Sequence, residues 1–284
     1  MKVYFAPTLA AALNSDVEFD VTVEAEYGDN VVAGTYYTAA HHGSRHANPA
    51  PCVDEWIPYM PEAAVLVSHL DLDTIGGLAR VAGLDDMFDD NTGFWQVAAF
   101  VDVHGDHEIE SAPDYTPAIA RQIHAFKAWL AERRRARGRD PSDRLTDVTL
   151  RVLDAVTALE RILHDDPGLL AAGDEMVRQN TALDGSSLVA QYGRLLVRES
   201  DRFTNHLYRP GCDIILARNT ERGTVTLSTA RPTDLLNCAA TLQAIFGPEA
   251  GGRATIAGSP RGRVVSNDEW QNAIERVREI VGEL

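Results

Sequence analysis

The chain has 284 residues, and 45% of them are hydrophobic, which is enough to bury a substantial core in one large or two moderate domains. Its formal net charge of −16 argues against binding to long nucleic acids, which rewards surplus Lys and Arg. The three widely spaced cysteines indicate neither a disulfide framework nor a zinc motif. No apolar run reaches the roughly 20 residues of a membrane span, and the first residues do not resemble a signal peptide, so we expect a cytoplasmic protein.

The N-terminal third of the sequence predicts strands. The segment "KVYF" is strand-like, and "VEFDVTVEAEY" and "VVAGTYYTAA" flank the turn-forming "GDN", which predicts a hairpin. The histidine-rich "HHGSRHANPAPC" that follows is typical of a loop. The apolar run Ala63–Val67 then predicts a buried strand, and "IGGLARVAGLDD" predicts a helix after it.

The middle of the sequence predicts helices. The segment "TGFWQVAAFVDVHGDH" fits a buried helix or a buried strand, because an unbroken apolar run supports either. A helix is predicted from 118 to 139, and its basic end, 132–139, suits the solvated C-terminus of a helix better than a nucleic-acid patch. Further helices are predicted at 145–163, 175–180 and 187–198.

The C-terminal part of the sequence mixes both kinds of element. "CDIILARN" and "GTVTLSTA" predict strands, and a helix over 234–246, the glycine-rich "GPEAGGRATIAGSPRG" and a helix from Asp268 follow. The whole pattern predicts an α/β fold with an N-terminal domain on a mostly parallel sheet, a helical connector and a smaller C-terminal mixed α/β domain. We place these domains at 1–190 and 191–284.

The segment "VLVSHLDLDTIGG" carries His69, Asp71 and Asp73 directly after the predicted strand. Successive strand residues point to opposite faces, so these three would share one face if the strand continued. Two carboxylates and an imidazole suit a divalent cation such as Mn²⁺, Mg²⁺ or Zn²⁺. The alternative is a polar loop in which Asp73 caps the next helix. We favour metal binding, because capping alone does not explain the alternation.

Two further segments carry residue types that bind metals. "FVDVHGDH" places Asp102 and His104 after an apolar run, and "HHGSRH" offers His41 and His42. Histidines in such positions serve as metal ligands, phosphate contacts or general acids. A solvated turn is the alternative in both segments.

The glycine-rich C-terminal loop combines Gly251 and Gly252 with Arg253 and Arg261. Glycines allow a ligand to approach the backbone closely, and guanidinium groups recognise phosphate. A plain connecting loop is the alternative, but the combination favours recognition of an anion.

The quoted motifs resemble those of the DHH phosphoesterase superfamily. "HLDLDTIGG" is similar to its strand-end acidic motif, and "VDVHG" is similar to its Asp-His-His signature. The C-terminal segment from "GTVTLSTA" to "AGSPRG" is similar to the DHH-associated substrate domain. The order of the parts agrees as well, so the resemblance covers most of the chain.

This resemblance implies a metal-dependent phosphoesterase, a hydrolase that acts on a small phosphorylated substrate such as a nucleotide or a short oligonucleotide. Mn²⁺ is the cation it implies first, with Zn²⁺ or Mg²⁺ as alternatives. His104 and the C-terminal arginines would stabilise charge while activated water attacks phosphorus in line. Gly251, Gly252, Arg253 and Arg261 would bind the substrate. The metal ligands would be Asp71, Asp73 and Asp102, then His69, with His41 and His42 as further candidates.

Two other interpretations remain open. Val103 stands where the first histidine of the Asp-His-His signature is expected, which would suit a non-catalytic protein that binds a nucleotide or a metal on a degenerate DHH fold. "SHLDLDTIGG" is also similar to the "THxHxDHxGG" motif of metallo-β-lactamase-type hydrolases, which would predict zinc. Under every interpretation the sequence leaves a homo-oligomer open and predicts no membrane partner.

Overall fold

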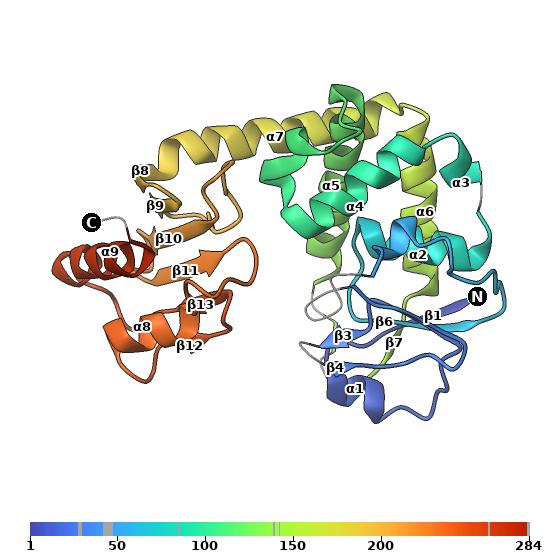
Figure 1. Ribbon diagram of the computed structural model, residues 1–284, viewed down its shortest axis with the longest axis horizontal. Coiled ribbons are helices and arrows are strands. Elements are labelled where there is room, and N and C mark those ends of the chain that lie inside the picture. The colour runs from blue at the N-terminus through green and yellow to red at the C-terminus, as the bar shows by residue number, and fades with distance from the viewer. Residues whose placement is uncertain are drawn as a thin grey trace. The chain divides into compact units, whose positions relative to one another are not determined.

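The computed structural model describes residues 1–27, 30–41, 48–84, 86–138, 140–141, 143–260 and 262–282. It confirms a mixed α/β fold with a mostly parallel sheet and a separate C-terminal mixed sheet (Figure 1). The chain forms two compact units, one of residues 1–103 and 109–177, the other of residues 104–108 and 178–284. None of the helices in the described ranges combines the length and the apolar character that crossing a bilayer requires.

A five-stranded sheet forms the base of the first unit. Across the sheet the order is β5 (Tyr37–Ala39), β2 (Val21–Val23), β6 (Ala64–Val67), β1 (Lys2–Phe5) and β7 (Thr146–Asp147). The first four strands run parallel, and β7 pairs with β1 in the antiparallel direction. Because parallel strands end at the same edge of a sheet, the residues that follow β2, β5 and β6 gather there.

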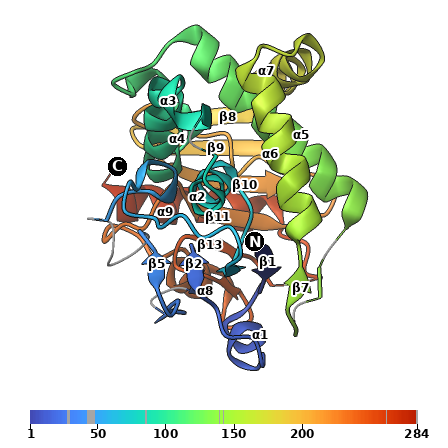
Figure 2. The same cartoon turned by 90° about the vertical axis from the view of Figure 1, so that its right-hand side faces the viewer.

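Helices bury both faces of this sheet, which explains why "AVLV" of β6 is apolar throughout. Val65 and Val67 pack into a core with the helices of one face, whereas Leu66 packs on the other face near the short α1 (Leu9–Leu13). Figure 2 shows α1 and α2 on opposite sides of the strands. The helices of the larger core are α2 (Leu72–Ala82), α4 (Thr92–His104), α5 (Pro117–Arg137) and α6 (Thr149–Leu163). Shorter helical turns are α3 (Asp86–Asp89) and the 3₁₀ turns Pro51–Val53 and Asp106–Ser111.

The hairpin predicted around "GDN" forms, but it is much shorter than predicted. A two-stranded antiparallel pair, β3 (Glu26–Tyr27) and β4 (Asn30–Val31), is what forms there. The longer segments on either side, β2 and β5, instead pair in parallel. The alternating run cannot continue as one strand because Glu24 has a left-handed backbone with φ of 50°, which bends the chain out of the sheet.

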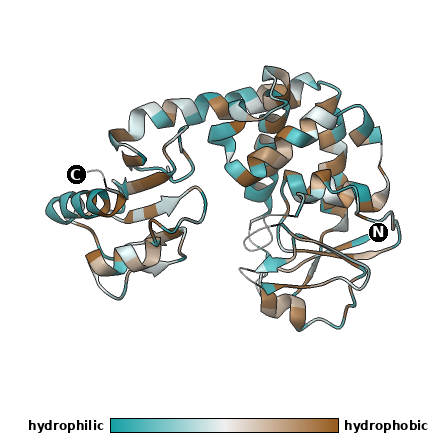
Figure 3. Ribbon diagram, viewed as in Figure 1, coloured by the Kyte–Doolittle hydropathy of each residue, from teal (hydrophilic) through white to brown (hydrophobic). Residues whose placement is uncertain are grey.

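The second unit contains a six-stranded sheet covered on one face by helices. Val197, Leu216 and Leu227 point from the sheet into a core with Leu242 and Trp270 of those helices. In Figure 3, α9 is mostly teal, whereas the strands carry brown segments. The strand order is β12 (Gly251–Gly252), β13 (Ile256–Gly258), β11 (Val225–Thr229), β10 (Ile214–Asn219), β9 (Leu195–Ser200) and β8 (Leu188–Tyr192), with β9 and β10 parallel. The helices are α8 (Cys238–Phe246) and α9 (Asn267–Val281), and α7 (Pro167–Ser187) precedes β8.

The helix predicted over 187–198 is wrong, because this segment forms the antiparallel pair β8 and β9. Gly193, with φ of 48°, makes the turn between the two strands. Leu196 packs on one face of the sheet and its neighbours Leu195 and Val197 on the other, so burial on both faces produced an apolar run without strand alternation. The ambiguous segment "TGFWQVAAFVDVHGDH" contains the helix α4.

Candidate metal centre

Three neighbouring parallel strands are each followed, within two residues, by a potential metal ligand. Glu24 comes directly after β2, His41 follows the end of β5, and His69 follows the end of β6. Since these strands lie in the order β5-β2-β6, the three residues reach the same edge of the sheet. Helix α2 begins at that edge, with Asp71 as its N-cap and Asp73 in its first turn.

The first cluster consists of Glu24, His41, Asp73 and, from α4, Asp102. His41 Nε2 lies 3.1 Å from Glu24 Oε1, 3.1 Å from Asp73 Oδ2 and 3.3 Å from Asp102 Oδ2. The ligand atoms of the four residues all lie within 4.8 Å of one another. Asp102 has 17% side-chain exposure, and the other three are buried. One cation can therefore contact all four side chains in a nearly closed site.

A cation suits this cluster better than protons do. His41 Nε2 carries at most one hydrogen, so it can donate fully to only one of the three carboxylates around it, those of Glu24, Asp73 and Asp102. Burial acts to lower the pKa of His41, but the carboxylates of Asp102, Asp73 and Glu24 outweigh it and raise that pKa to about 12. Burial also raises the pKa of Asp73 to about 6. The charges of Glu24 and Asp102 add to this shift, and the hydrogen bond with His41 opposes it. The cluster thus concentrates negative charge that a divalent cation would neutralise.

The second cluster consists of Glu24, His69 and Asp71. His69 Nε2 lies 3.3 Å from Glu24 Oε2 and 3.1 Å from Asp71 Oδ2, and its Nδ1 is 2.9 Å from Ser68 Oγ. Burial acts to lower the pKa of His69, but hydrogen bonds to Asp71 and Glu24 outweigh it and raise the pKa to about 11. The side chains of His69 and Asp71 are 36% and 33% exposed, so this cluster is open to solvent. An open position of this kind is what a catalytic metal site needs for its substrate.

Glu24 belongs to both clusters and offers one carboxylate oxygen to each. Its Oε1 faces His41, while its Oε2 faces His69 and accepts a hydrogen bond of 2.5 Å from Thr74 Oγ1. With neutral imidazoles, the carboxylates of Glu24, Asp71, Asp73 and Asp102 carry four negative charges. Two divalent cations would balance this charge, and Glu24 would contribute to holding each of them.

The backbone at Glu24 is strained, because a non-glycine residue with φ of 50° lies in the left-handed region. Hydrogen bonds on both sides hold this conformation. Its N–H donates to Ala39 O at 2.8 Å, and its carbonyl accepts from Ser68 Oγ. The neighbouring strands β5 and β6 therefore fix the direction in which the Glu24 carboxylate leaves the sheet.

The 3₁₀ turn Pro51–Val53 positions the Asp73 carboxylate, since Cys52 N–H donates to Asp73 Oδ1 at 2.7 Å. This contact requires α2 to lie very close to the turn. A Cβ on Gly76 would lie 2.4 Å from Cys52 Cβ and 2.7 Å from the Trp95 ring. The glycine therefore permits the approach that positions the carboxylate.

Gly76→Ala is expected to lower the free energy of unfolding by about 1–3 kcal/mol, although alanine favours helices, because the methyl group overpacks this contact. Gly185→Ala in α7 is the matched control, since a Cβ there meets nothing within 4 Å and should stabilise by up to about 1 kcal/mol. Urea denaturation of both variants measures the difference. Equal shifts would show that the close approach at Gly76 carries no cost.

The basic end of α5, expected to be solvated, partly contacts the metal centre. Arg134 Nη2 donates a hydrogen bond to the carbonyl of Leu70, the residue between His69 and Asp71. Burial lowers the pKa of Arg134, and the nearby charge of Asp71 opposes that shift. Arg134 thus fixes the loop that carries the second cluster, a role that helix periodicity did not reveal.

The structure brings together His41, His69, Asp71, Asp73 and Asp102, all of which the sequence suggested as ligands. His69, Asp71 and Asp73 do not continue one extended strand, because β6 ends at Val67 and α2 begins at Leu72. Asp71, not Asp73, is the helix cap, with Oδ1 accepting from Thr74 N–H at 3.0 Å. His42 and Arg261 lie outside the described residues.

The other predicted site residues belong to the second unit and lie in neither cluster. His104 lines a cavity of about 370 Å³ with His107 and Arg231. Gly251 and Gly252 line a cavity of about 680 Å³, where a Cβ on Gly252 would lie 2.4 Å from Ile256 O. Arg253 follows them in the chain and is exposed. These placements leave the predicted roles of His104, Gly251, Gly252 and Arg253 as predictions.

Glu24 is the residue that the sequence analysis missed. In the predicted hairpin it was one polar position of an alternating strand. The available signal was that "VTV", "YTA" and "AVLV" are each followed within two residues by Glu or His. These residues come together only if the three strands are parallel, because parallel strands end at the same edge of the sheet.

No protein-family model matches the sequence, and no curated protein matches it. Among solved structures, the fold is similar to a pGpG-specific phosphodiesterase, PggH from Vibrio cholerae, with a TM-score of 0.45 and 10% identity over 93% of this chain and 84% of that chain. It is also similar to an uncharacterized protein from Helicobacter pylori G27, with a TM-score of 0.25 and 12% identity over 77% and 68% of the two chains. At these TM-scores neither likeness supports an argument about function, which has to be inferred from the chain's own residues.

Proposed function

We propose that the protein is a metal-dependent phosphoesterase that hydrolyses a small phosphorylated substrate, such as a nucleotide or a short oligonucleotide. The observation that carries this proposal is the pair of clusters that share Glu24, one buried and one open to solvent. A closed cluster suits a firmly held cation, and an open one leaves room for a phosphate oxygen.

Mn²⁺ is the proposed cation. The donor set of four carboxylates and two imidazoles mixes the oxygen ligands that Mg²⁺ prefers with nitrogen ligands that Mn²⁺ and Zn²⁺ accept. Thiolates, which favour Zn²⁺, do not belong to either cluster in the described part of the chain. The order of preference is therefore Mn²⁺ first, with Zn²⁺ and Mg²⁺ as comparisons.

The chain's own residues would orient the reaction. Glu24 and Asp71 present oxygen atoms that Thr74 fixes through its hydroxyl and its N–H, so both carboxylates are preorganised. Ser68 Oγ lies beside Nδ1 of His69, which leaves Nε2 directed at the carboxylates. When bound, divalent cations lower the pKa of water and neutralise charge on a phosphate.

The remaining parts of the proposal concern the substrate. The net charge of −16 disfavours the binding of long polyanions, whereas a small phosphate can bind at a local site. We propose that the backbone at Gly251 and Gly252, with Arg253, contributes to phosphate binding. In this scheme residues 1–190 bind the metal and residues 191–284 bind the substrate.

The test combines metal content with hydrolysis. The full chain is loaded with Mn²⁺, Zn²⁺ or Mg²⁺, desalted and analysed for bound metal. It is then assayed against bis(4-nitrophenyl) phosphate, 4-nitrophenyl phosphate and short oligonucleotides. We expect about two Mn²⁺ per chain and metal-dependent hydrolysis. Asp71→Asn should lower turnover by about a hundredfold or more, because it removes a ligand of the open cluster.

Asp174→Asn is the matched control, since Asp174 is an exposed carboxylate paired with Arg121 at 2.7 Å. It should change neither metal content nor turnover. Firm metal binding without hydrolysis of any substrate would contradict the enzyme and favour a non-catalytic binding protein. Activity with Zn²⁺ but not Mn²⁺ would contradict the proposed cation and favour the lactamase-type chemistry.

A further inference from the structure

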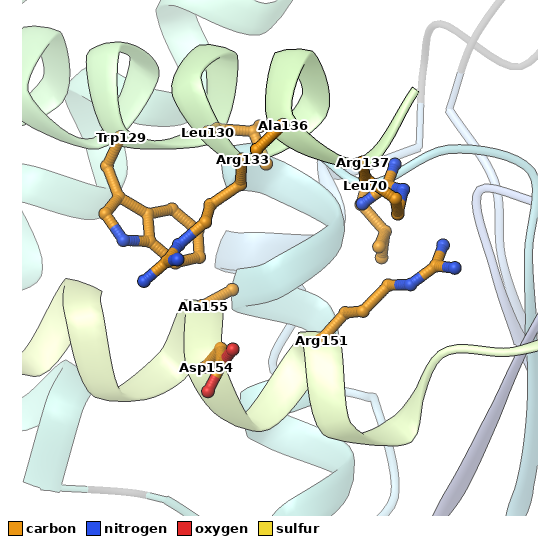
Figure 4. A pocket seen from close by; sticks show the side chains of 9 residues that line it. All are labelled: Leu70, Trp129, Leu130, Arg133, Ala136, Arg137, Arg151, Asp154 and Ala155. Atoms are coloured by element: carbon orange, nitrogen blue, oxygen red, sulfur yellow. The ribbon is translucent and has the colours of Figure 1, made fainter. Parts of the chain in front are cut away.

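Apart from the metal centre, the first unit contains a cavity of about 300 Å³ at the C-terminal end of α5, lined also by α6 and by Leu70 from the loop after β6. Figure 4 shows Trp129 and Arg133 reaching into it from α5, and Arg151 and Asp154 from α6. The volume lies at the lower end of the range typical of small-molecule sites. No group in either metal cluster lines it.

One part of the lining is apolar and aromatic. Leu70 and Leu130 lie in the wall, and Ala155 is only 2% exposed. Trp129 is 9% exposed, so its indole can present only a limited surface to the cavity. A flat apolar ring would bury area against these groups and stack with the indole or with a guanidinium plane.

The other part of the lining is cationic. Arg137 and Arg151 share a single carboxylate, Asp140, with N···O distances of 3.3 and 2.8 Å. The guanidinium carbon of Arg133 lies 5.5 Å from the ring centroid of Trp129. The guanidinium groups are those of Arg133, Arg137 and Arg151. The carboxylates beside them are those of Asp140 and Asp154, so the positive charges outnumber the negative ones by one. The cavity is therefore locally positive in a chain whose net charge is −16, which favours an anionic ligand.

We propose that this cavity is a binding site for a small aromatic anion, such as an aryl carboxylate or an aryl phosphate. The ring would lie against Trp129 and the leucines, and the anionic group would pair with Arg133. The ligand would thereby satisfy both kinds of surface at once, which neither a neutral ring nor a bare anion can do.

The same ligand would act on the open metal cluster through Leu70. The Leu70 side chain lines the cavity, its carbonyl accepts a hydrogen bond from Arg134, and it stands between His69 and Asp71. A ligand packed against Leu70 would hold this loop in place and so strengthen cation binding there. This coupling rests on the proposed function, whereas binding to the cavity does not.

The first experiment titrates 2-naphthoate into the metal-free full chain by calorimetry. Neutral 2-naphthamide and acetate serve as comparisons, because each retains only one half of the proposed ligand. We expect saturable binding of 2-naphthoate at one site per chain. Both comparison compounds should bind at least about tenfold more weakly, because 2-naphthamide loses the charge-assisted hydrogen bond and acetate loses the buried ring.

Arg133→Gln should weaken 2-naphthoate about tenfold, because it removes the guanidinium group that pairs with the anion. Arg135→Gln is the matched control, since it removes the same charge from the same helix but does not line the cavity. Equal effects of the two variants would overturn the site and indicate only the general charge of α5. Absence of saturable binding, or equal binding of 2-naphthamide, would overturn it as well.

The coupling is tested by measuring Mn²⁺ affinity with and without saturating 2-naphthoate. We expect a severalfold increase for the wild type, which Arg133→Gln should reach only at about tenfold higher 2-naphthoate concentrations, and the reciprocal effect on 2-naphthoate affinity must have the same size. An unchanged Mn²⁺ affinity would overturn the coupling and leave the binding site intact. If Mn²⁺ does not bind at all, the proposed function fails together with the coupling, whereas the metal-free titration still decides the cavity.

Discussion

Glu24→Gln is expected to weaken cation binding at both clusters with one substitution, because each cluster depends on one oxygen of this carboxylate. The open cluster would retain only His69 and Asp71, too few ligands to hold a cation. The buried cluster would retain three ligands and should bind about tenfold to a hundredfold more weakly. Metal analysis after desalting should fall from two ions per chain to one or none. Turnover should fall by about three orders of magnitude.

Two other variants make this result specific. Asp71→Asn removes a ligand from the open cluster alone and should leave one ion bound. Glu18→Gln removes the same charge from an exposed residue, whose carboxylate accepts a hydrogen bond from Thr35 Oγ1 at 3.2 Å, and should leave two. Retention of two ions by Glu24→Gln would show that the clusters do not share this residue.

Asp184→Asn is expected to destabilise the second unit by about 3 kcal/mol, because it leaves a buried guanidinium group without its counter-charge. Arg198 is 0% exposed, and it donates hydrogen bonds to Asp184 Oδ1, to Ser187 Oγ and to Leu207 O. Arg209 also pairs with Asp184, through Nη2 at 2.5 Å. Urea denaturation, with hydrogen exchange of the β9 and β10 amides, measures the loss.

The effect of Asp184 also has a defined pH dependence. Burial acts to raise the pKa of Asp184, but hydrogen bonds from Arg209 and Arg198 outweigh it and lower that pKa below its ordinary value. A carboxyl group with a lowered pKa contributes stability above its unfolded pKa of about 3.9 and loses it as the pH falls through the folded value. The difference between the wild type and Asp184→Asn should therefore be constant near neutral pH and shrink in acid.

Asp174→Asn provides the comparison for this prediction too, since Asp174 lies on the same helix, α7, and also pairs with an arginine. Both partners of that pair are 47% exposed, so solvent replaces the lost contact and little stability should be lost. Similar losses in the two variants would indicate that burial of Arg198 is not what makes Asp184 important.

Local sequence patterns identified most of the residues that form the two clusters. The strand Ala64–Val67 and the ligand types His69, Asp71 and Asp73 after it follow from apolar patterning and from residue chemistry. Asp102 was recognised in the same way, although its helix could not be told from a strand. Such features depend on a few consecutive residues, which a single sequence displays directly.

The parts that escaped prediction depend on contacts between distant segments. Long-range packing decides whether β2 pairs with β5 in parallel or folds back as a hairpin. Because the sequence does not show this pairing, the role of Glu24 at the end of β2 could not be predicted. The segment 187–198 was assigned the wrong type because burial on both faces of a sheet removes strand alternation. Arg134 could not be connected with Leu70, because the two are 64 positions apart in the chain.

The left-handed backbone at Glu24 sets stability and chemistry against each other at a single position. Glycine would adopt φ of 50° without strain, so Glu24→Gly should relax the fold locally while removing the ligand shared by both clusters. Glycine would relieve the backbone strain, whereas the proposed cation and the hydrogen bonds with Thr74 and His41 favour glutamate. In a copy of this chain that no longer has to bind a cation, position 24 should therefore be among the first to be substituted, and glycine should be the residue that replaces glutamate.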